Sequence, residues 1–360
     1  MRVLVWQWGR RGAGPRFAAE LARAFNTVPE TEALLSLSAR AELLGSADAP
    51  PCALRVPTYQ GLAGLAGRVL STPVLVPRLA AWLRAQRVEV ALCAMPAPMD
   101  FAMAAALAWA GVPFAVVVHD ADPHPGDGFP MQIQLQRWLL RGASGVFALS
   151  THVADRLRQQ RLAAGKPLLL ASHPPFAFGP APPPARAHGG RLRLLSFGRL
   201  LPYKGLDLLA DSLALLGARD DLEVRVVGSG PETPVLDRLR ALPGVVVENR
   251  WVPENEVGPL LAWSDALVLS HREASQSGVA ASAIAARRWL IATRVGGLPE
   301  QLGGEDMALL CEPTPASIAA AIGRLLAAGS LPQTRSGDPR ASWSGAAGSM
   351  VEGLAALSRK

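Results

Sequence analysis

The sequence predicts an α/β protein made of two doubly wound domains, each with a parallel sheet covered by helices on both faces. Two observations lead to this prediction. Short apolar runs alternate with amphipathic helical segments along most of the chain, which is typical of repeated strand–helix units. A proline-rich stretch divides the alternation into two similar halves, and a length of 360 residues suits two domains of ordinary size.

The first half alternates strands and helices from its beginning. Its first apolar run is too short for a secretory signal and is interpreted as a strand. The uncharged stretch 101–118 is divided by Gly111 and Pro113, which predicts a helix, a turn and a buried strand instead of a membrane span. The expected strands are Val3–Trp6, Ala33–Leu37, Val88–Cys93, Phe114–Val118 and Gly145–Leu149. The expected helices are Phe17–Phe25, Val74–Arg84, Ala102–Ala110, Gln132–Arg141 and His152–Gln160.

The second half repeats this pattern after Arg191. Thr314 followed by Pro315 is a typical helix start, with a capping hydroxyl and proline in the first turn. The expected strands are Leu192–Phe197, Glu223–Val227, Val245–Val247, Ala266–Leu269, Leu290–Ala292 and Ala308–Cys311. The expected helices are Leu206–Leu216, Val235–Ala241, Glu254–Trp263, Gly278–Ala286 and Ile318–Ala327.

The stretch from His173 to Pro184 has too many prolines for a helix or a central strand, so we predict a semi-rigid linker there. The predicted organisation is an N-terminal domain over residues 1–173, the linker over 174–190 and a C-terminal domain over 191–335. Residues 329–344 have the composition of a loop. A C-terminal helix within 340–360, centred on Met350–Leu357, is expected to pack back on the N-terminal domain.

The composition limits the classes of partner. The formal net charge is +7, but the basic residues form no dense run with interleaved aromatic residues, which argues against nucleic acid. Phosphate-bearing ligands and an anionic membrane surface suit the charge better. The three cysteines are scattered in apolar contexts, which argues against a disulfide framework and against a metal cluster.

The segment from Gly198 to Gly205 is the most informative in the chain. It holds Arg199 and Lys204, one of only three lysines, between an apolar run and an amphipathic helix. An arginine offers a bidentate fork, a lysine a mobile point charge and a helix N-terminus exposed N–H groups, so together they can hold a diphosphate. The alternative is that both residues are ordinary surface charges on a strand–helix loop.

Three further loops follow strands at the same predicted sheet edge, at residues 228–230, 275–278 and 296–297. Glycine turns let the backbone approach a ligand closely, and small hydroxyl residues at a helix start suit phosphate oxygens. The Glu273 carboxylate can accept hydrogen bonds from the hydroxyl groups of a bound sugar. The alternative is a set of tight turns and one helix cap. The ligand-binding candidates are Gly198, Gly228, Gly230, Ser275, Gln276, Ser277, Gly278, Gly296 and Gly297.

In this order, the segments from Leu192 to Glu300 resemble the C-terminal half of retaining glycosyltransferase family 4, which has the GT-B fold. Family members read G-R-x₄-K-G, V-x-G-x-G, a glutamate-bracketed loop and V-G-G-x-P-E. The resemblance implies two Rossmann-like domains facing across a cleft, the N-terminal one on the acceptor side and the C-terminal one binding a nucleotide-sugar donor. It also implies that Arg199 and Lys204 grip the donor diphosphate and that the loop at Gly228 lies near the nucleotide.

The chain departs from the family pattern at the bracketed loop. Members carry two glutamates separated by seven residues, but counting back from Gly296 places Ala274 and Ser282 at those positions. The segment Ser275–Gly278 resembles a subset with S-x-S-G-type loops. The ribose contacts must then come from elsewhere.

The N-terminal half resembles the family more loosely. The loop Gly12-Ala13-Gly14 follows the first strand, where members approach the acceptor or the donor phosphate. Members often place a histidine beside the donor sugar at the position of His119, which we take as a catalytic candidate with Arg199, Lys204 and Glu273. Asp120 is assigned to the acceptor or phosphate loop, and His124 is the alternative histidine. The alternatives are an ordinary turn and a structural histidine satisfied by Asp120.

The resemblance implies transfer of a hexose from a nucleoside-diphosphate sugar with retention at the anomeric carbon. Arg199, Lys204 and the helix N-terminus at Gly278 are expected to stabilise the leaving diphosphate. The Asp-x-Asp sequence at 120–122 lies in the other half of the chain. We therefore expect no metal and no other cofactor; the alternative is a metal bound at the two aspartates of this sequence.

The segment Tyr59–Arg87 interleaves apolar residues, Leu79 and Leu83 among them, with Arg68, Arg78 and Arg84. A basic and apolar face suits an anionic bilayer and a saccharide or polyprenyl-linked saccharide acceptor. The alternative is a pair of core helices with solvated arginines. We expect a cytoplasmic protein, peripheral at the inner face of the plasma membrane, in bacterial exopolysaccharide or cell-surface glycan synthesis.

Three other functions remain open. A nucleotide-sugar epimerase would share the fold, but its carboxylates and histidines cannot be placed. A nicotinamide dehydrogenase is disfavoured because neither glycine turn continues into G-x-G-x-x-G. The third is a catalytically decayed scaffold, which the missing second glutamate favours and the intact Arg199 and Lys204 oppose.

Overall fold

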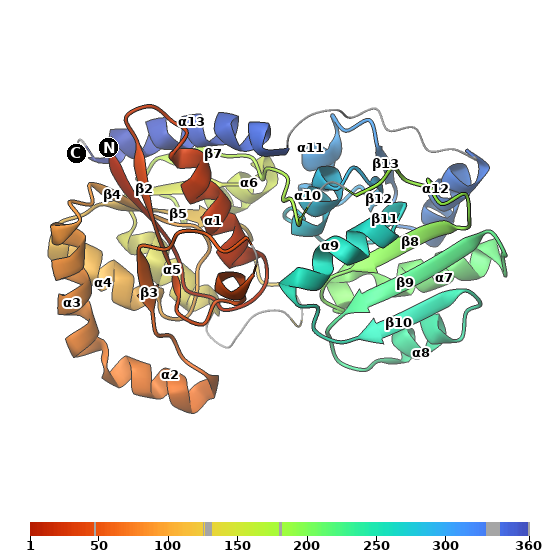
Figure 1. Cartoon of the computed structure of the whole chain (residues 1–360), viewed down its shortest axis with the longest axis horizontal. Coiled ribbons are helices and arrows are strands. Elements are labelled where there is room, and N and C mark those ends of the chain that lie inside the picture. Colours follow the sequence, from red (N-terminus) through yellow and green to blue (C-terminus); the bar gives the residue numbers. More distant parts are fainter. Residues whose placement is uncertain (47, 125, 127–131, 180–181, 329–338, 359–360) are drawn as a thin grey trace. The chain divides into compact units, whose positions relative to one another are not determined.

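A computed structural model describes residues 1–46, 48–124, 126, 132–179, 182–328 and 339–358. It confirms the predicted class, because the chain forms two α/β units with all-parallel sheets (Figure 1). Within the described ranges, the first unit comprises residues 1–122, 132–172 and 340–358, and the second comprises residues 123–126, 173–328 and 339. The predicted end of the second domain at residue 335 and part of the predicted 329–344 loop lie outside the described residues.

The first unit contains a sheet of seven parallel strands in the order β3-β2-β1-β4-β5-β6-β7. The strand order reverses beside β1, which pairs with β2 on one side and β4 on the other. The central strands are buried on both faces, which explains their nearly continuous apolar sequences. Two strands of three residues, β3 and β7, were not predicted from the sequence. The bounds are β1 (Arg2–Gln7), β2 (Glu32–Ser38), β3 (Leu54–Val56), β4 (Val90–Cys93), β5 (Phe114–Val118), β6 (Gly145–Ala148) and β7 (Leu168–Leu170).

Helices of the first unit follow its strands and cover the sheet. Helix α2 was not predicted, because its glycines weaken the helical pattern. In Figure 1 it lies at the edge of the unit, beyond α3. The bounds are α1 (Ala13–Phe25), α2 (Gly61–Leu70), α3 (Thr72–Ala85), α4 (Asp100–Ala110), α5 (Gln132–Gly142) and α6 (Thr151–Gln159), with a 3₁₀ turn at η1 (Glu42–Gly45).

The C-terminal helix α13 (Pro339–Ser358) is longer than the predicted segment Met350–Leu357 and packs on the first unit (Figure 1). The ring of Trp343 lies 5.6 Å from the ring of Phe17 in α1. The helix was underestimated because its glycines and serines are weak helix formers. Its buried positions nevertheless have helical spacing: Trp343, Ala347, Met350, Leu354 and Leu357.

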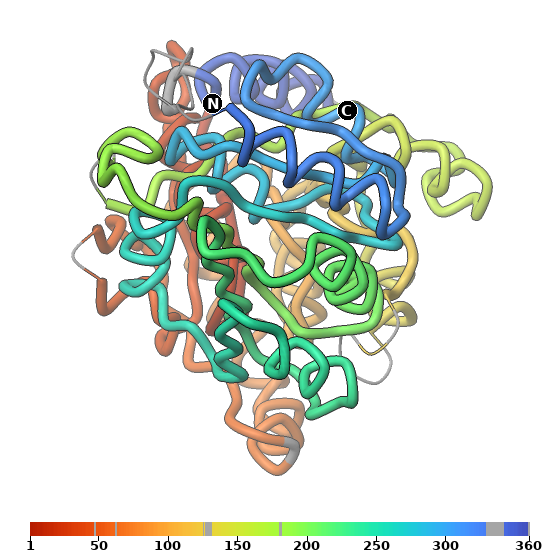
Figure 2. The backbone as a smooth tube through the Cα atoms, turned by 90° about the vertical axis from the view of Figure 1, so that its right-hand side faces the viewer, coloured from red at the N-terminus to blue at the C-terminus, as the bar shows by residue number. Residues whose placement is uncertain are grey.

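The second unit contains six parallel strands in the order β10-β9-β8-β11-β12-β13. Successive side chains of β8 enter two different cores, since Leu194 packs with α7, α8 and α12, and Leu195 packs with α9, α10 and α11. Helices α12 and α7 lie side by side on the same face of the sheet (Figure 2). The strands are β8 (Leu192–Phe197), β9 (Leu222–Gly228), β10 (Val245–Asn249), β11 (Ala266–Leu269), β12 (Trp289–Thr293) and β13 (Ala308–Cys311). The helices are α7 (Leu206–Leu216), α8 (Pro234–Arg240), α9 (Glu254–Trp263), α10 (Gly278–Ala285), α11 (Leu298–Leu302) and α12 (Pro315–Ala327), with a 3₁₀ turn at η2 (Pro202–Lys204).

The described part of the proline-rich segment packs against the second unit. Phe176 is buried, and its N–H donates to the carbonyl of Ala281 at 3.3 Å. The buried carboxylate of Asp265 accepts hydrogen bonds from the backbone N–H groups of Arg186 and Arg193 and lies 3.1 Å from Nε2 of His188. The segment therefore belongs to the core of the second unit, a role that its proline content alone did not indicate.

Candidate functional site

The carboxyl ends of β8 and β11 form the edge at which the predicted cations lie. In the second sheet the strand order reverses beside β8, which is where doubly wound sheets bind ligands. A pocket opens at this edge, and Gly198, Arg199, Lys204, Ser270 and His271 are among its lining residues. Arg199 is exposed and Lys204 is half-buried. The structure thus brings the two predicted cations to one pocket.

Gly228 ends β9 and Gly230 lies in the turn that follows, and both glycines have a packing reason as well as a predicted ligand. A Cβ atom at Gly228 would lie 1.6 Å from the carbonyl oxygen of Gly198, and one at Gly230 would lie 2.2 Å from the carbonyl oxygen of Leu200. The backbone of this turn therefore presses directly on the loop that carries Arg199. These glycines position the cation loop whether or not they also approach a nucleotide.

The side chain of Lys204 is held against a histidine that the sequence analysis left without a role. Lys204 Nζ lies 2.8 Å from His271 Nε2, and the Ser270 hydroxyl donates to the Lys204 carbonyl at 2.9 Å. His271 is only 4% exposed. Burial, together with the nearby ammonium, holds the pKa of His271 well below its usual value, so the ring is neutral at physiological pH.

Two more aromatic groups stand beside Lys204 in the same unit. The ring of His124 stacks on the ring of Tyr203 at 4.4 Å with an interplanar angle of 13°. His124 Nδ1 lies 3.9 Å from Glu273 Oε2, a carboxylate whose side chain is 61% exposed. The alternative histidine and the predicted sugar-binding acid therefore lie near Lys204. Tyr203 was missed, although it precedes the lysine in the motif.

The hydroxyl-rich loop caps helix α10. Ser277 is the N-cap, and its hydroxyl accepts from the N–H of Ala280 at 3.2 Å. The Ser277 N–H donates to Gln301 Oε1 at 2.9 Å. At the second glutamate position of the family pattern, the Ser282 hydroxyl donates to the Gly278 carbonyl at 2.7 Å. Ser282 and Ala274 are both buried, so neither supplies a carboxylate-like group to a ligand.

The remaining loop candidates follow their strands at the same sheet edge. Ser275 is buried and Gln276 is half-buried, and both precede α10. Gly296 and Gly297 follow β12, and the N–H of Gly297 donates to the carbonyl of Ala274 at 2.9 Å. The glycine pair is thereby tied to the hydroxyl-rich loop.

His119 and Asp120 belong to the first unit, at the end of β5. His119 is buried, its Nε2 lies 2.9 Å from the carbonyl of Ala94, and its ring meets the ring of Phe17 edge-on at 4.8 Å. Burial lowers the pKa of His119 below its usual value. This environment agrees with a structural histidine, in which Nε2 contacts a backbone carbonyl, while the nearby charge of Asp120 opposes the lowering of the His119 pKa.

The predicted loop Gly12-Ala13-Gly14 lies at the start of α1 in the first unit. Gly12 is the N-cap with a φ of +80°, and Ala13 is the first helical residue. A Cβ atom at Gly14 would lie 2.8 Å from Nε2 of Gln7, a buried amide on β1. The loop therefore places the N-terminal N–H groups of α1 beside the end of the first strand.

The Asp-x-Asp sequence is partly committed to an ion pair. Asp122 Oδ2 lies 2.7 Å from Arg156 Nε and accepts a further hydrogen bond from Gln160. The hydrogen bond from Arg156 lowers the pKa of Asp122. Within the part of the chain that the structure describes, no group of three or more His, Cys, Asp or Glu residues is placed to hold a metal ion.

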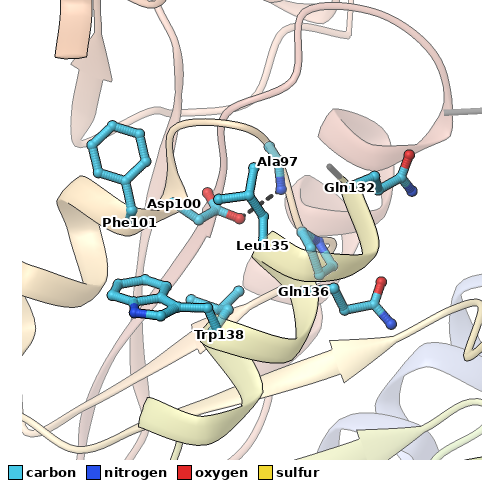
Figure 3. Close-up of a pocket in the computed structure, with 9 residues that line it drawn as sticks. Ala97, Asp100, Phe101, Gln132, Leu135, Gln136 and Trp138 are labelled. Carbon is cyan, nitrogen blue, oxygen red and sulfur yellow. Dashed lines mark hydrogen bonds between the residues drawn. The ribbon is translucent and has the colours of Figure 1, made fainter. Parts of the chain in front are cut away.

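The first unit has a pocket that the sequence did not predict, between α4 and α5 (Figure 3). Phe101, Leu135 and Trp138 are among its lining residues, and Asp100 lies in its wall. The carboxylate of Asp100 accepts from the N–H of Ala97 at 2.7 Å and from Trp6 Nε1 at 3.1 Å. Burial raises the pKa of Asp100 to about 7 despite these donors.

Two family models match the chain. The model described as "Glycosyl transferase 4-like domain" matches residues 16–172, and the model described as "Glycosyl transferases group 1" matches residues 191–328. A search of curated proteins by sequence gives no match.

Several solved structures are similar over nearly the whole chain. Sucrose-phosphate synthase from Thermosynechococcus elongatus is 16% identical with a TM-score of 0.64, covering 99% of this chain and 96% of that chain. Anabaena HepE in complex with UDP and glucose is 16% identical with a TM-score of 0.66, covering 100% and 97%. UDP-GlcNAc 2-epimerase from Neisseria meningitidis, bound to UDP-GlcNAc, is 11% identical with a TM-score of 0.60, covering 99% and 100%. At these identities the likeness is one of fold.

Proposed function

The chain belongs to the glycosyltransferases of the GT-B fold, and from this premise we propose that it transfers a hexose with retention from a nucleoside-diphosphate sugar to a hydroxyl of a saccharide or lipid-linked saccharide. The observation that carries the proposal is the pocket at the ends of β8 and β11, which both Arg199 and Lys204 line. Two cations at one sheet edge match the charge of a diphosphate.

The chemistry is charge stabilisation at the leaving group. When the bond between the anomeric carbon and the diphosphate breaks, negative charge develops on the departing phosphate, where Arg199 and Lys204 lie. The N-terminus of α10 at Gly278 adds N–H donors. The acceptor oxygen forms its new bond on the face that the diphosphate leaves, and its proton passes to that phosphate. In this scheme protein cations provide the charge, without a metal.

The donor is tested by calorimetric titration with UDP, GDP and their sugars. UDP is the first choice because the similar HepE structure holds UDP. We expect the wild-type protein to bind one of these nucleoside diphosphates. We also expect it to cleave the corresponding nucleotide-sugar only when an acceptor is present. Conversion of UDP-GlcNAc to its 2-epimer without acceptor would instead indicate an epimerase. If no nucleotide binds, the protein is a decayed scaffold and the transferase proposal is wrong.

The acceptor side of the proposal is peripheral attachment to an anionic membrane. The structure corrects the apolar face expected for Tyr59–Arg87, because Leu79 and Leu83 are buried in the core of the first unit. Among the side chains described in this segment, the exposed large apolar ones are Val69, Leu70 and Val74, at 47%, 81% and 55%. They lie where α2 meets α3, with Arg68 half-buried and Arg78 and Arg84 exposed nearby in sequence. Among the helices described, none is long and apolar enough to cross a membrane.

Flotation with phosphatidylglycerol vesicles tests this attachment. We expect the double variant Arg68→Glu/Arg78→Glu to lose binding by about tenfold or more, since each basic residue near an anionic surface contributes about 1 kcal/mol. Leu70→Asp should weaken binding as well. Leu215→Asp is the matched control, because Leu215 is an exposed leucine of the second unit, at 64%. Equal flotation of all four proteins would contradict the attachment.

A further inference from the structure

His271 is a buried polar residue that the proposed chemistry does not use. Its imidazole is 4% exposed and lines the same pocket as Arg199 and Lys204. Its Nε2 lies 2.8 Å from the ammonium nitrogen of Lys204. A histidine is seldom buried beside a cation without a reason, because burial and the positive charge both oppose its protonation.

The identity of the donor in this contact is fixed by chemistry. An ammonium group has three N–H donors and no acceptor, so Nε2 of His271 must accept. The ring proton is then on Nδ1. The depressed pKa of His271 agrees with this neutral form. A neutral acceptor holds the ammonium group in place and leaves its positive charge intact. A carboxylate would neutralise that charge.

The backbone on both sides of the contact is held in place. The hydroxyl of Ser270 donates to the carbonyl of Lys204, and the hydroxyl of Thr293 donates to the carbonyl of His271 at 2.7 Å. Gly205 has a φ of +62°, and a Cβ atom there would lie 2.0 Å from the carbonyl oxygen of Ser270. The turn that carries Lys204 is therefore seated directly on the end of β11. The side chain of Lys204 contacts His271 Nε2 and also lies over the Tyr203 ring, with Nζ 5.2 Å from the ring centroid.

We infer that His271 is a positioning residue, which holds the ammonium of Lys204 at the diphosphate pocket by accepting its hydrogen bond; this inference rests on the proposed function. A lysine side chain has four rotatable bonds, and fixing it costs conformational entropy. His271 meets that cost before the donor binds. The neighbouring Arg272 does not share this task, because its guanidinium pairs with Asp207.

A double-mutant cycle on UDP affinity tests the inference, with His271→Leu, Lys204→Met and the double variant. We expect His271→Leu to raise the Kd for UDP about tenfold, the effect of losing one charge-assisted hydrogen bond. In the Lys204→Met background the same change should alter the Kd by less than about twofold, because the two residues act as one unit. His271→Gln, whose amide oxygen keeps an acceptor, should restore most of the affinity. The Kd for uridine should stay constant throughout.

A second readout reports the contact without activity. Nitrogen NMR of isotope-labelled histidines should show His271 as the Nδ1–H tautomer, and the resonance of Nε2 should shift in Lys204→Met. Circular dichroism establishes that each variant folds.

The outcomes separate this inference from the proposed function. If the wild-type protein binds no nucleoside diphosphate, both fall. If Lys204→Met loses UDP affinity but His271→Leu does not, only the role of His271 is wrong. The inference would also be wrong if His271→Leu still lowered the UDP affinity tenfold in the Lys204→Met background. His271 would then act on the ligand directly.

Discussion

Replacing Lys204 by methionine should lower kcat roughly 100- to 1,000-fold, the usual cost of removing one preorganised group that stabilises developing negative charge. The half-buried ammonium of Lys204 is held at the pocket by His271, and burial strengthens its interaction with a diphosphate. Arg199→Met should lower kcat by a smaller factor, because the Arg199 side chain is exposed and water screens its charge. Steady-state kinetics with a saturating nucleotide-sugar measure both effects.

The matched control for these variants is Arg238→Met. Arg238 belongs to the same unit and pairs with Asp211 on α7, at the surface. The variant Arg238→Met removes one positive charge, just as Lys204→Met does. A general electrostatic effect on donor binding would therefore appear in both variants. Turnover that survives in the double variant Arg199→Met/Lys204→Met would show that the leaving group is stabilised elsewhere.

The variant Gly228→Ala should unfold more easily than the wild-type protein, with a loss of about 3 kcal/mol in the free energy of unfolding. A methyl group at residue 228 would lie 1.6 Å from the carbonyl oxygen of Gly198, so backbone has to move. Because that movement displaces the loop that carries Arg199, nucleotide affinity should fall as well. Denaturant unfolding followed by circular dichroism gives the first quantity, and calorimetry gives the second.

Gly323→Ala is the corresponding control, in the interior of α12. No heavy atom lies within 4 Å of a Cβ atom built at Gly323. Alanine there should stabilise the protein by up to about 1 kcal/mol, because glycine is the poorer helix former. Equal stability of the two variants would mean that the turn after β9 can relax freely, and the argument for its rigidity would fail.

The strands and most helices were predictable because their signals are local. Buried parallel strands such as Phe114–Val118 are apolar on both faces, so composition alone marks them. Strand β7 was missed because three residues leave too short a pattern. Helix α13 was shortened because its glycines hid a spacing that starts at Trp343.

The predicted cation pair was also a local signal, since Arg199 and Lys204 stand in one short loop between a strand and a helix. The histidines were harder to assign. The sequence predicted a catalytic role for His119, which is buried against Phe17 and the carbonyl of Ala94. It left His271 without a role and kept His124 as an alternative, yet these two lie beside Lys204 and Tyr203.

The sequence by itself determined the two parallel α/β units and the loop that carries Arg199 and Lys204, because apolar periodicity and short motifs are written in neighbouring residues. Only the tertiary structure decided which side chains meet that loop. His124 stacks on Tyr203, His271 accepts from Lys204, and Gly198 touches Gly228, although each pair is distant in the chain. Such contacts arise from strand order and loop packing, which place distant residues at one sheet edge.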